Sequence, residues 1–115
     1  MSFIARWLNL AKDRQNVGLR PHRDIVLETG YESAFDRVLR AVDGAIGAYV
    51  AVADRRGGTI EAAFGLVNNE RVRCTLQPLD ETHTTVRIEA FFPATSSVRA
   101  RSDAVDTLAD YLTRP

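Results

Sequence analysis

The side chains that most often do chemistry in proteins are few and scattered in this sequence. Cys74 is the only cysteine, and His22 and His83 are the only histidines. None of the three has a neighbour at the spacing of a metal ligand set, such as His-x-x-x-His or Cys-x-x-Cys. A lone thiol at an inward strand position is typical of a buried and inert side chain. The sequence therefore predicts no metal site, no cofactor and no cysteine nucleophile.

Paired carboxylates are a second source of chemistry. Asp80 and Glu81 are adjacent in an expected turn, which predicts two solvated carboxylates and not a tuned acid–base dyad. Three further carboxylates share one flank of an expected helix beside several arginines: Asp103, Asp106 and Asp110. Gly57 and Gly58 lack the Gly-Lys-Ser/Thr continuation of a phosphate-binding loop. Because no nucleophile and base can be assembled, we expect a protein that is not an enzyme.

The strongest structural pattern lies in the second half of the chain. Three runs of alternating apolar and polar residues begin there, at Thr59, Arg71 and Thr85. A period of two is typical of strands with one dry face and one wet face. Two shorter strands are expected at Asp24–Glu28 and Ala48–Asp54.

Two segments have helical periodicity and can cover the dry face. The first is Tyr31–Ile46, with Thr29 as N-cap and Glu32 at N3 of a capping box. The second is 97–112, with a serine cap at position 96 or 97. The predicted fold class is α+β: a four- to five-stranded antiparallel sheet with two helices packed on one face, in the order β-α-β-β-β-β-α. Its core is expected to contain Phe35, Leu39, Phe64, Cys74, Ile88 and Leu108.

Turn residues predict which strand residues face each other. The loop Arg55–Gly57 fits a three-residue hairpin whose final glycine is left-handed. Such a loop places Val52 opposite Ile60 and Val50 opposite Ala62, all on the dry face.

The wet face is expected to carry mostly charged side chains: Glu61, Arg71, Arg73, Thr75, Thr85, Arg87 and Glu89. A turn centred on Asp80 places Arg71 opposite Glu89 and Arg73 opposite Arg87. Sheets that bind the minor groove of DNA through their open face instead carry apolar and amide residues there and insert aromatic wedges. The mixed charges therefore predict cross-strand ion pairs and no nucleic-acid partner.

The composition is typical of a single small domain, and its balanced charges produce no long-range electrostatic field. The chain has 115 residues, of which 45% are hydrophobic, and its 15 basic residues balance 15 acidic ones. No run approaches the roughly 18–20 apolar residues of a membrane span. One cysteine fits a reducing compartment, and the almost exclusive use of arginine fits a GC-rich bacterial genome, so we expect a bacterial cytoplasmic protein.

The expected domain organisation has three parts. An amphipathic helix occupies residues 1–19, a linker residues 20–23 and the α+β domain residues 24–115. The helix presents an apolar strip that we take as the candidate interaction surface: Phe3, Ile4, Trp7, Leu8 and Leu10. Such a strip is seldom left bare on a soluble monomer.

The β-α-β4-α order resembles the helix-grip and TATA-binding-protein-like class of folds. The local pattern Tyr31-Glu-Ser-Ala-Phe35, then Leu39 and Val42, then Ala53-Asp-Arg-Arg-Gly-Gly-Thr-Ile60 is similar to that of small bacterial helix-grip-like domains of unknown function. The resemblance covers residues 24–112. It implies the fold, and for larger helix-grip proteins it implies an apolar ligand cavity, although this chain lacks the two extra strands of those proteins.

These observations favour a non-enzymatic module that binds protein, with self-association into a homo-oligomer as the main expectation. A small apolar-ligand-binding helix-grip domain is the first alternative. A peripheral membrane adaptor that uses the N-terminal helix at a membrane surface is the second.

Overall fold

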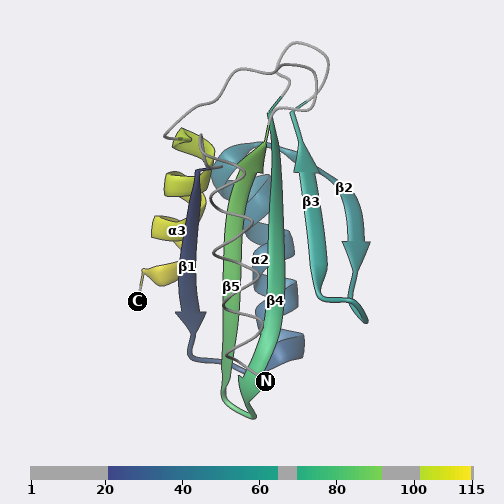
Figure 1. The fold of residues 1–115 in the computed structure, drawn as a ribbon, viewed down its shortest axis with the longest axis vertical. Helices are drawn as coiled ribbons and strands as arrows, with labels where there is room; N and C mark the ends of the chain where they lie inside the picture. The colour runs from purple at the N-terminus through teal and green to yellow at the C-terminus, as the bar shows by residue number, and fades with distance from the viewer. Residues whose placement is uncertain (1–20, 65–69, 92–101, 115) are drawn as a thin grey trace, which may run out of the picture.

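The computed structural model describes residues 21–64, 70–91 and 102–114. These residues form one antiparallel sheet with both helices on the same face (Figure 1). The elements follow in the order β1 (His22–Leu27), α2 (Tyr31–Ile46), β2 (Tyr49–Asp54), β3 (Thr59–Ala63), β4 (Arg71–Asp80), β5 (His83–Phe91) and α3 (Asp103–Thr113). The predicted α+β class and the order of its elements are confirmed. The predicted N-terminal helix lies outside the described residues.

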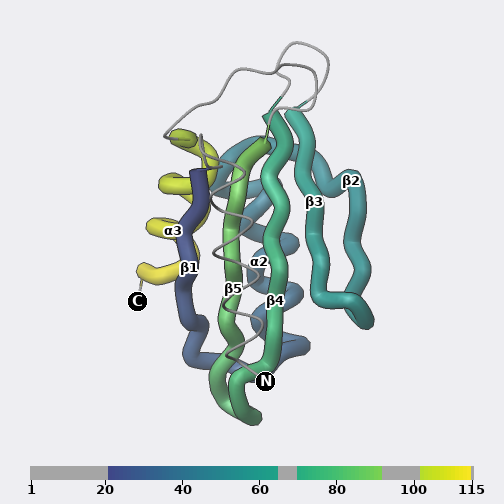
Figure 2. The backbone as a smooth tube through the Cα atoms, viewed as in Figure 1, coloured from purple at the N-terminus to yellow at the C-terminus, as the bar shows by residue number. Residues whose placement is uncertain are grey.

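The five strands are arranged in the order β1-β5-β4-β3-β2, so the first strand lies beside the last (Figure 2). Helix α3 packs behind β1 and β5, and α2 packs behind the middle of the sheet (Figure 1). The two edges of the sheet are therefore β1, which α3 covers from behind, and β2, which is farthest from α3. Strand β1 begins two residues before the predicted Asp24, at His22.

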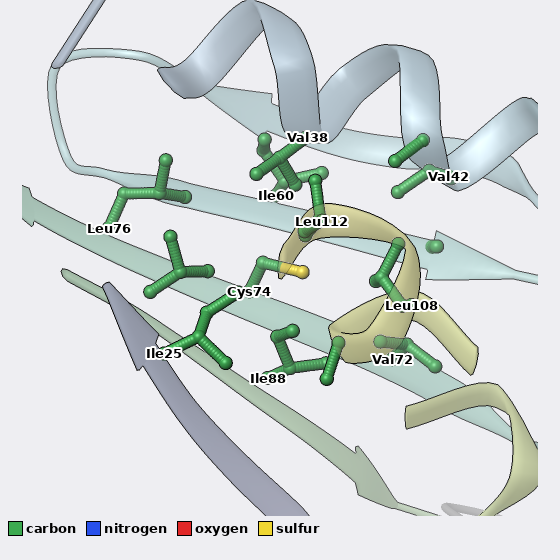
Figure 3. Packing of buried hydrophobic residues seen from close by; sticks show 14 of the residues in the cluster. Ile25, Val38, Val42, Ile60, Val72, Cys74, Leu76, Ile88, Leu108 and Leu112 are labelled. Atoms are coloured by element: carbon green, nitrogen blue, oxygen red, sulfur yellow. The ribbon is translucent and has the colours of Figure 1, made fainter. Parts of the chain in front are cut away.

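The core lies between the sheet and the two helices (Figure 3). Alternate strand residues such as Ile60, Val72 and Ile88 are fully buried against Val38 and Leu108. Of the six predicted core residues, four are buried and two, Leu39 and Phe64, are partly buried and packed against the cluster. The helical and strand periods therefore identified the core face of each element correctly.

Helix α2 has the predicted bounds, Tyr31–Ile46, but a different N-cap. Its N-cap is Gly30, without any side-chain capping bond, so the Thr29 capping box is wrong. The carbonyl oxygen of Thr29 instead accepts a hydrogen bond from Thr84 Oγ1 at 3.0 Å. The helix ends at Ile46, and the left-handed backbone of its C-cap, Gly47 (φ 64°), lets the N–H of Ala48 donate to the carbonyl of Val42 at 3.1 Å.

Helix α3 begins later than predicted. Its N-cap is Ser102, whose hydroxyl accepts a hydrogen bond from the N–H of Val105 at 3.2 Å. The same hydroxyl donates to the carboxylate of Glu70. Because Ser102 has an extended backbone, the prediction of one continuous helix over 97–112 is wrong; the two expected cap serines lie outside the described residues.

The β2–β3 hairpin keeps one predicted pair and loses the other. Val50 faces Ala62 as expected, but a bulge follows, and Val52 faces Glu61 instead of Ile60. The loop has four residues, because Asp54 Oδ1 accepts from the N–H of Gly57 at 2.9 Å and left-handed geometry falls one residue later, at Gly58 (φ 76°).

The β4–β5 pairing is shifted by two residues from the prediction. Arg73 faces Glu89 and Thr75 faces Arg87, because Asp80 pairs with His83 and the chain turns after Asp80. An even shift leaves every side chain on its expected face, so the composition of the open face is unchanged.

Candidate functional site

The predicted interaction surface and the described part of the chain do not overlap. Phe3, Ile4, Trp7, Leu8 and Leu10 all lie outside the described residues, so their role stays a prediction. The described residues offer a different candidate, the free edge of strand β2, Tyr49–Asp54, which we call the β2 edge.

The β2 edge is exposed along its whole length and carries no charge until its last residue. All six residues are exposed, with exposed fractions of 56% for Tyr49, 39% for Val50 and 42% for Val52. An edge strand has a row of backbone N–H and C=O groups without a neighbouring strand. Apolar side chains beside such a row make it a template on which another strand can pair.

The bulge explains why Val52 faces solvent on the open side of the sheet. Ala51 has no partner on β3, so Val50 shares the helix side of the sheet with Ala62 while Val52 shares the open side with Glu61. Valines therefore point to both faces of the edge. The sequence signal was the nearly unbroken apolar run from Ala48 to Ala53, which does not alternate as a half-buried strand does.

The opposite edge of the sheet, β1, is protected against pairing with another strand by charged side chains. Strand β1 begins with His22, Arg23 and Asp24, and charged groups on an edge discourage pairing with a foreign strand. Arg23 also donates to Asp106 of α3 at 3.3 Å and lies 3.6 Å from Asp110. The contrast between the two edges singles out β2.

A clamp around Arg55 holds the hairpin that carries the β2 edge. The guanidinium of Arg55 donates to Asp36 at 2.7 Å and to Glu32 at 2.9 Å, both on the first turns of α2. It also lies over the ring of Phe35, and its backbone carbonyl accepts from the hydroxyl of Tyr31 at 2.5 Å. We call these five residues the Arg55 clamp.

Two groups of the clamp, the guanidinium of Arg55 and the phenol of Tyr31, keep their protons around neutral pH. The hydrogen bond to Asp36, followed by that to Glu32, raises the pKa of Arg55 above its ordinary value. Burial, followed by the charge of Glu32, raises the pKa of Tyr31. The arginine therefore stays charged and the phenol keeps the proton that it donates.

On the open face of the sheet, the charge of Arg73 is balanced by carboxylates on the two neighbouring strands. Arg73 Nε donates to Glu61 at 3.1 Å, and Glu89 lies directly across from Arg73 on β5. The guanidinium carbon of Arg73 is 5.0 Å from the centre of the Phe91 ring. The contact of Arg73 with Glu61 on β3 is a cross-strand ion pair of the kind that the mixed charges predict, whereas the predicted facing of Arg73 and Arg87 is wrong.

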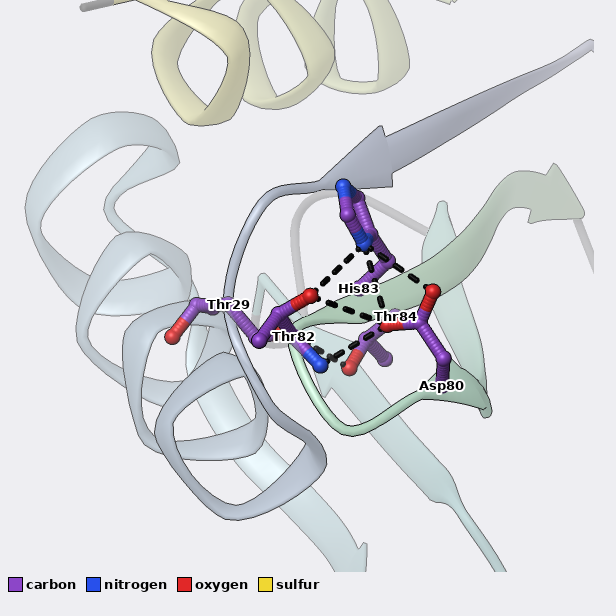
Figure 4. Close-up of polar contacts among 5 residues, drawn as sticks. All are labelled: Thr29, Asp80, Thr82, His83 and Thr84. Atoms are coloured by element: carbon purple, nitrogen blue, oxygen red, sulfur yellow. Dashed lines mark hydrogen bonds and ion pairs between the residues drawn. The ribbon is translucent and has the colours of Figure 1, made fainter.

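Asp80, Thr82 and His83 resemble a catalytic triad in composition but not in geometry (Figure 4). Thr82 Oγ1 and Asp80 Oδ1 both lie 3.0 Å from the same ring nitrogen, Nδ1 of His83. A general base needs its acid partner on one nitrogen and the nucleophile on the other. The cluster closes the β4–β5 turn, and the backbone N–H of Thr82, followed by His83, lowers the pKa of Asp80.

The remaining chemical candidates are not assembled into a site. Burial raises the pKa of the Cys74 thiol to about 12, so it is not a thiolate at neutral pH. No three His, Cys, Asp or Glu residues within the described ranges are placed to hold a metal ion. Neither described helix is long and apolar enough to cross a membrane.

Comparison with known proteins adds little. No protein-family model matches the chain, and no curated protein matches it. Among solved structures it is similar to a Thermobifida fusca protein determined by solution NMR in a structural genomics programme. The two are 13% identical with a TM-score of 0.38, over 79% of this chain and 78% of that one. A likeness at this level carries no inference about function.

Proposed function

We propose that this chain is a non-enzymatic protein-binding module that accepts an extended polypeptide segment at the β2 edge. The observation that carries the proposal is the contrast between the two sheet edges. The β2 edge is exposed, apolar and without charge over its first five residues, whereas β1 is charged and backed by α3. Strand addition at such an edge gives affinity through main-chain hydrogen bonds and specificity through alternate side chains.

The proposal also includes the helix-grip-like class and a cytoplasmic location, and it is weighed against two alternative functions. Assignment to the helix-grip-like class is supported by the order of elements, and a cytoplasmic location by the lone buried cysteine. The apolar-ligand alternative requires an enclosed cavity, and the described side chains between sheet and helices pack into one cluster. The membrane alternative depends on residues 1–19, which lie outside the described ranges.

A titration tests the proposal. The probe is a synthetic capped peptide with the β2 sequence, Tyr-Val-Ala-Val-Ala-Asp, added to the isotope-labelled full chain. We expect NMR shift changes in the backbone amides of β2 and β3 and none in β1. The control peptide has proline at its third position, which removes an N–H and the extended geometry. Shift changes confined to another surface, or none at all, would contradict strand addition at this edge.

A further inference from the structure

We infer that the β2 edge pairs with the β2 edge of a second copy of this chain, antiparallel and across a two-fold axis, which joins two five-stranded sheets into one. The inference rests on the proposed function and names its partner. The same strand serves both partners in such an isologous contact. Three properties of the described residues favour a second copy: the faces of the side chains, the charges and the second edge.

The bulge makes an end-to-end self-complementary register possible, in which the first residue of β2 faces the last. Tyr49, Val52 and Asp54 share the open side of the sheet, and Val50 and Ala53 share the helix side. Directly opposed residues of an antiparallel pair lie on the same face. Pairing Tyr49 with Asp54 and Val50 with Ala53 of the second copy satisfies this condition for both pairs. A regular six-residue strand could not satisfy it in this end-to-end register, because its first and last residues would point to opposite faces.

Charge does not oppose this register. Asp54 is the only charged residue of β2, and it lies at the end of the strand. In the proposed register the two Asp54 residues are about five residues apart along the seam, or about 17 Å. This exceeds the Debye length of about 10 Å at 0.1 M salt. The chain also has no net charge, so two copies approach without long-range repulsion.

The second edge of the sheet limits the assembly to two copies. Head-to-tail pairing of β2 with β1 would leave a free edge at each end and continue into a fibre. The charges of β1 and its contact with α3 disfavour that pairing. The two-fold contact uses both β2 edges and leaves one continuous sheet whose outer edges are both β1.

The contact area sets the strength of the dimer. Two six-residue strands and their side chains bury less than the roughly 1,200 Å² of a standard stable interface. We therefore expect a dimer that forms at high micromolar concentration and dissociates on dilution.

Sedimentation of the full chain over a wide concentration range tests the inference. We expect a monomer–dimer equilibrium for the unmodified chain. Val52→Lys and Val52→Glu should each remain monomeric, because the two substituted side chains lie within about 8 Å of each other at the two-fold axis. An equimolar mixture of the two variants should recover the dimer, because opposite charges then meet. The matched control is Val26→Lys on the β1 edge, where Val26 is 49% exposed, and it should dimerise normally.

A second pair of variants tests the register and does not depend on the fold tolerating charge at Val52. Tyr49 is 56% exposed and faces Asp54 of the second copy in the proposed register. Tyr49→Lys should keep the dimer, and Tyr49→Glu should weaken it at least about tenfold, because like charges directly opposite destabilise a strand pair. Equal effects of the two substitutions would contradict the register. Circular dichroism of each variant checks that it is folded.

The outcomes separate this inference from the proposed function. An unmodified chain that stays monomeric at every concentration overturns self-pairing, while binding of the capped peptide at β2 still supports strand addition. A dimer that survives in Val52→Lys, or that is lost in Val26→Lys, also overturns self-pairing through β2. A chain that neither dimerises nor binds the peptide overturns both.

Discussion

The guanidinium carbon of Arg55 lies 4.5 Å from the centre of the Phe35 ring, which joins the tip of the β2–β3 hairpin to the core. Phe35 is 1% exposed and belongs to the main cluster, whereas Arg55 lies in a surface loop. An aromatic ring and an arginine attract each other in this geometry. Because every residue of β2 is exposed, this pair at the tip helps to attach the hairpin to α2.

Replacing Arg55 should loosen the hairpin without unfolding the domain. In Arg55→Ala the bonds to Asp36 and Glu32 are lost, and the ring of Phe35 loses its cover. We expect faster amide hydrogen exchange in β2 and unchanged exchange in β4 and β5. Arg56→Ala is the control, since Arg56 is exposed beside it in the same loop. Equal exchange in both variants would show that the clamp does not hold the edge.

Two glycines should respond in opposite ways to alanine. Gly58 has φ 76°, and a Cβ there would lie 2.4 Å from the carbonyl oxygen of Leu76, so Gly58→Ala should lower the free energy of unfolding. Strained backbone and the clash together predict a loss of at least about 2 kcal/mol. Gly44 lies within α2 with nothing within 4 Å of its added Cβ. Gly44→Ala should therefore raise stability by about 0.5–1 kcal/mol. Urea unfolding measures both, and a Gly58→Ala protein as stable as the unmodified chain would contradict the loop geometry.

Cys74 should make stability fall in alkaline solution. Its pKa is about 12 in the folded chain against an ordinary value of 9.0, so the unfolded chain releases the proton first. The contribution of the protonated thiol to the free energy of unfolding is fully retained below about pH 9. It is lost as the pH rises towards 12, by about 1.4 kcal/mol per pH unit. Cys74→Ala lacks this loss, so the stability difference between the two proteins should shrink above about pH 9. A constant difference across that range would mean that the thiol is accessible to water when folded.

Trp7 reports on the N-terminal strip because it is the only tryptophan. If the strip packs on protein, emission should be blue-shifted in dilute buffer and should not move when anionic vesicles are added. Emission that is red-shifted in buffer and moves to the blue with vesicles would instead support the membrane alternative. Trp7→Ala should still dimerise if the β2 edge is the seam. If Trp7→Ala loses the dimer while the Val52 variants keep it, the interface lies at the N-terminal strip and not at the β2 edge.

Periodicity predicted which face each element buries, whereas local chemistry decided how the elements begin and pair. The bounds of α2 and the inward faces of β3, β4 and β5 follow from spacing alone, because burial of apolar side chains dominates there. The N-cap of α2 could not be predicted from spacing. The carbonyl of Thr29 accepts a hydrogen bond from Thr84, and Gly30 lies against the turn after β4. That contact joins residues distant in sequence, which no local pattern reveals.

The β2 edge shows why the candidate site was not predicted. The expected hairpin placed Val52 on the dry face, which would have hidden it from solvent. One bonded side chain, Asp54, lengthened the loop, and the single unpaired residue Ala51 moved Val52 to the open face. A one-residue bulge leaves almost no trace in the sequence, yet it reverses the face of the residues that follow it along the strand.

The adjacency of β1 and β5 has a consequence for synthesis on the ribosome. Strand β1 is made first, but its neighbour β5 is the last strand to be made, and Leu27 pairs with Thr84. Strands β2 to β5 can pair with their neighbours as they emerge, whereas β1 must wait across a long loop. We expect a nascent chain that stops before β5 to leave Ile25 and Leu27 exposed to chaperones, however complete its other elements are. We therefore expect the pairing of β1 with β5 to be the last strand pairing that the nascent domain can form.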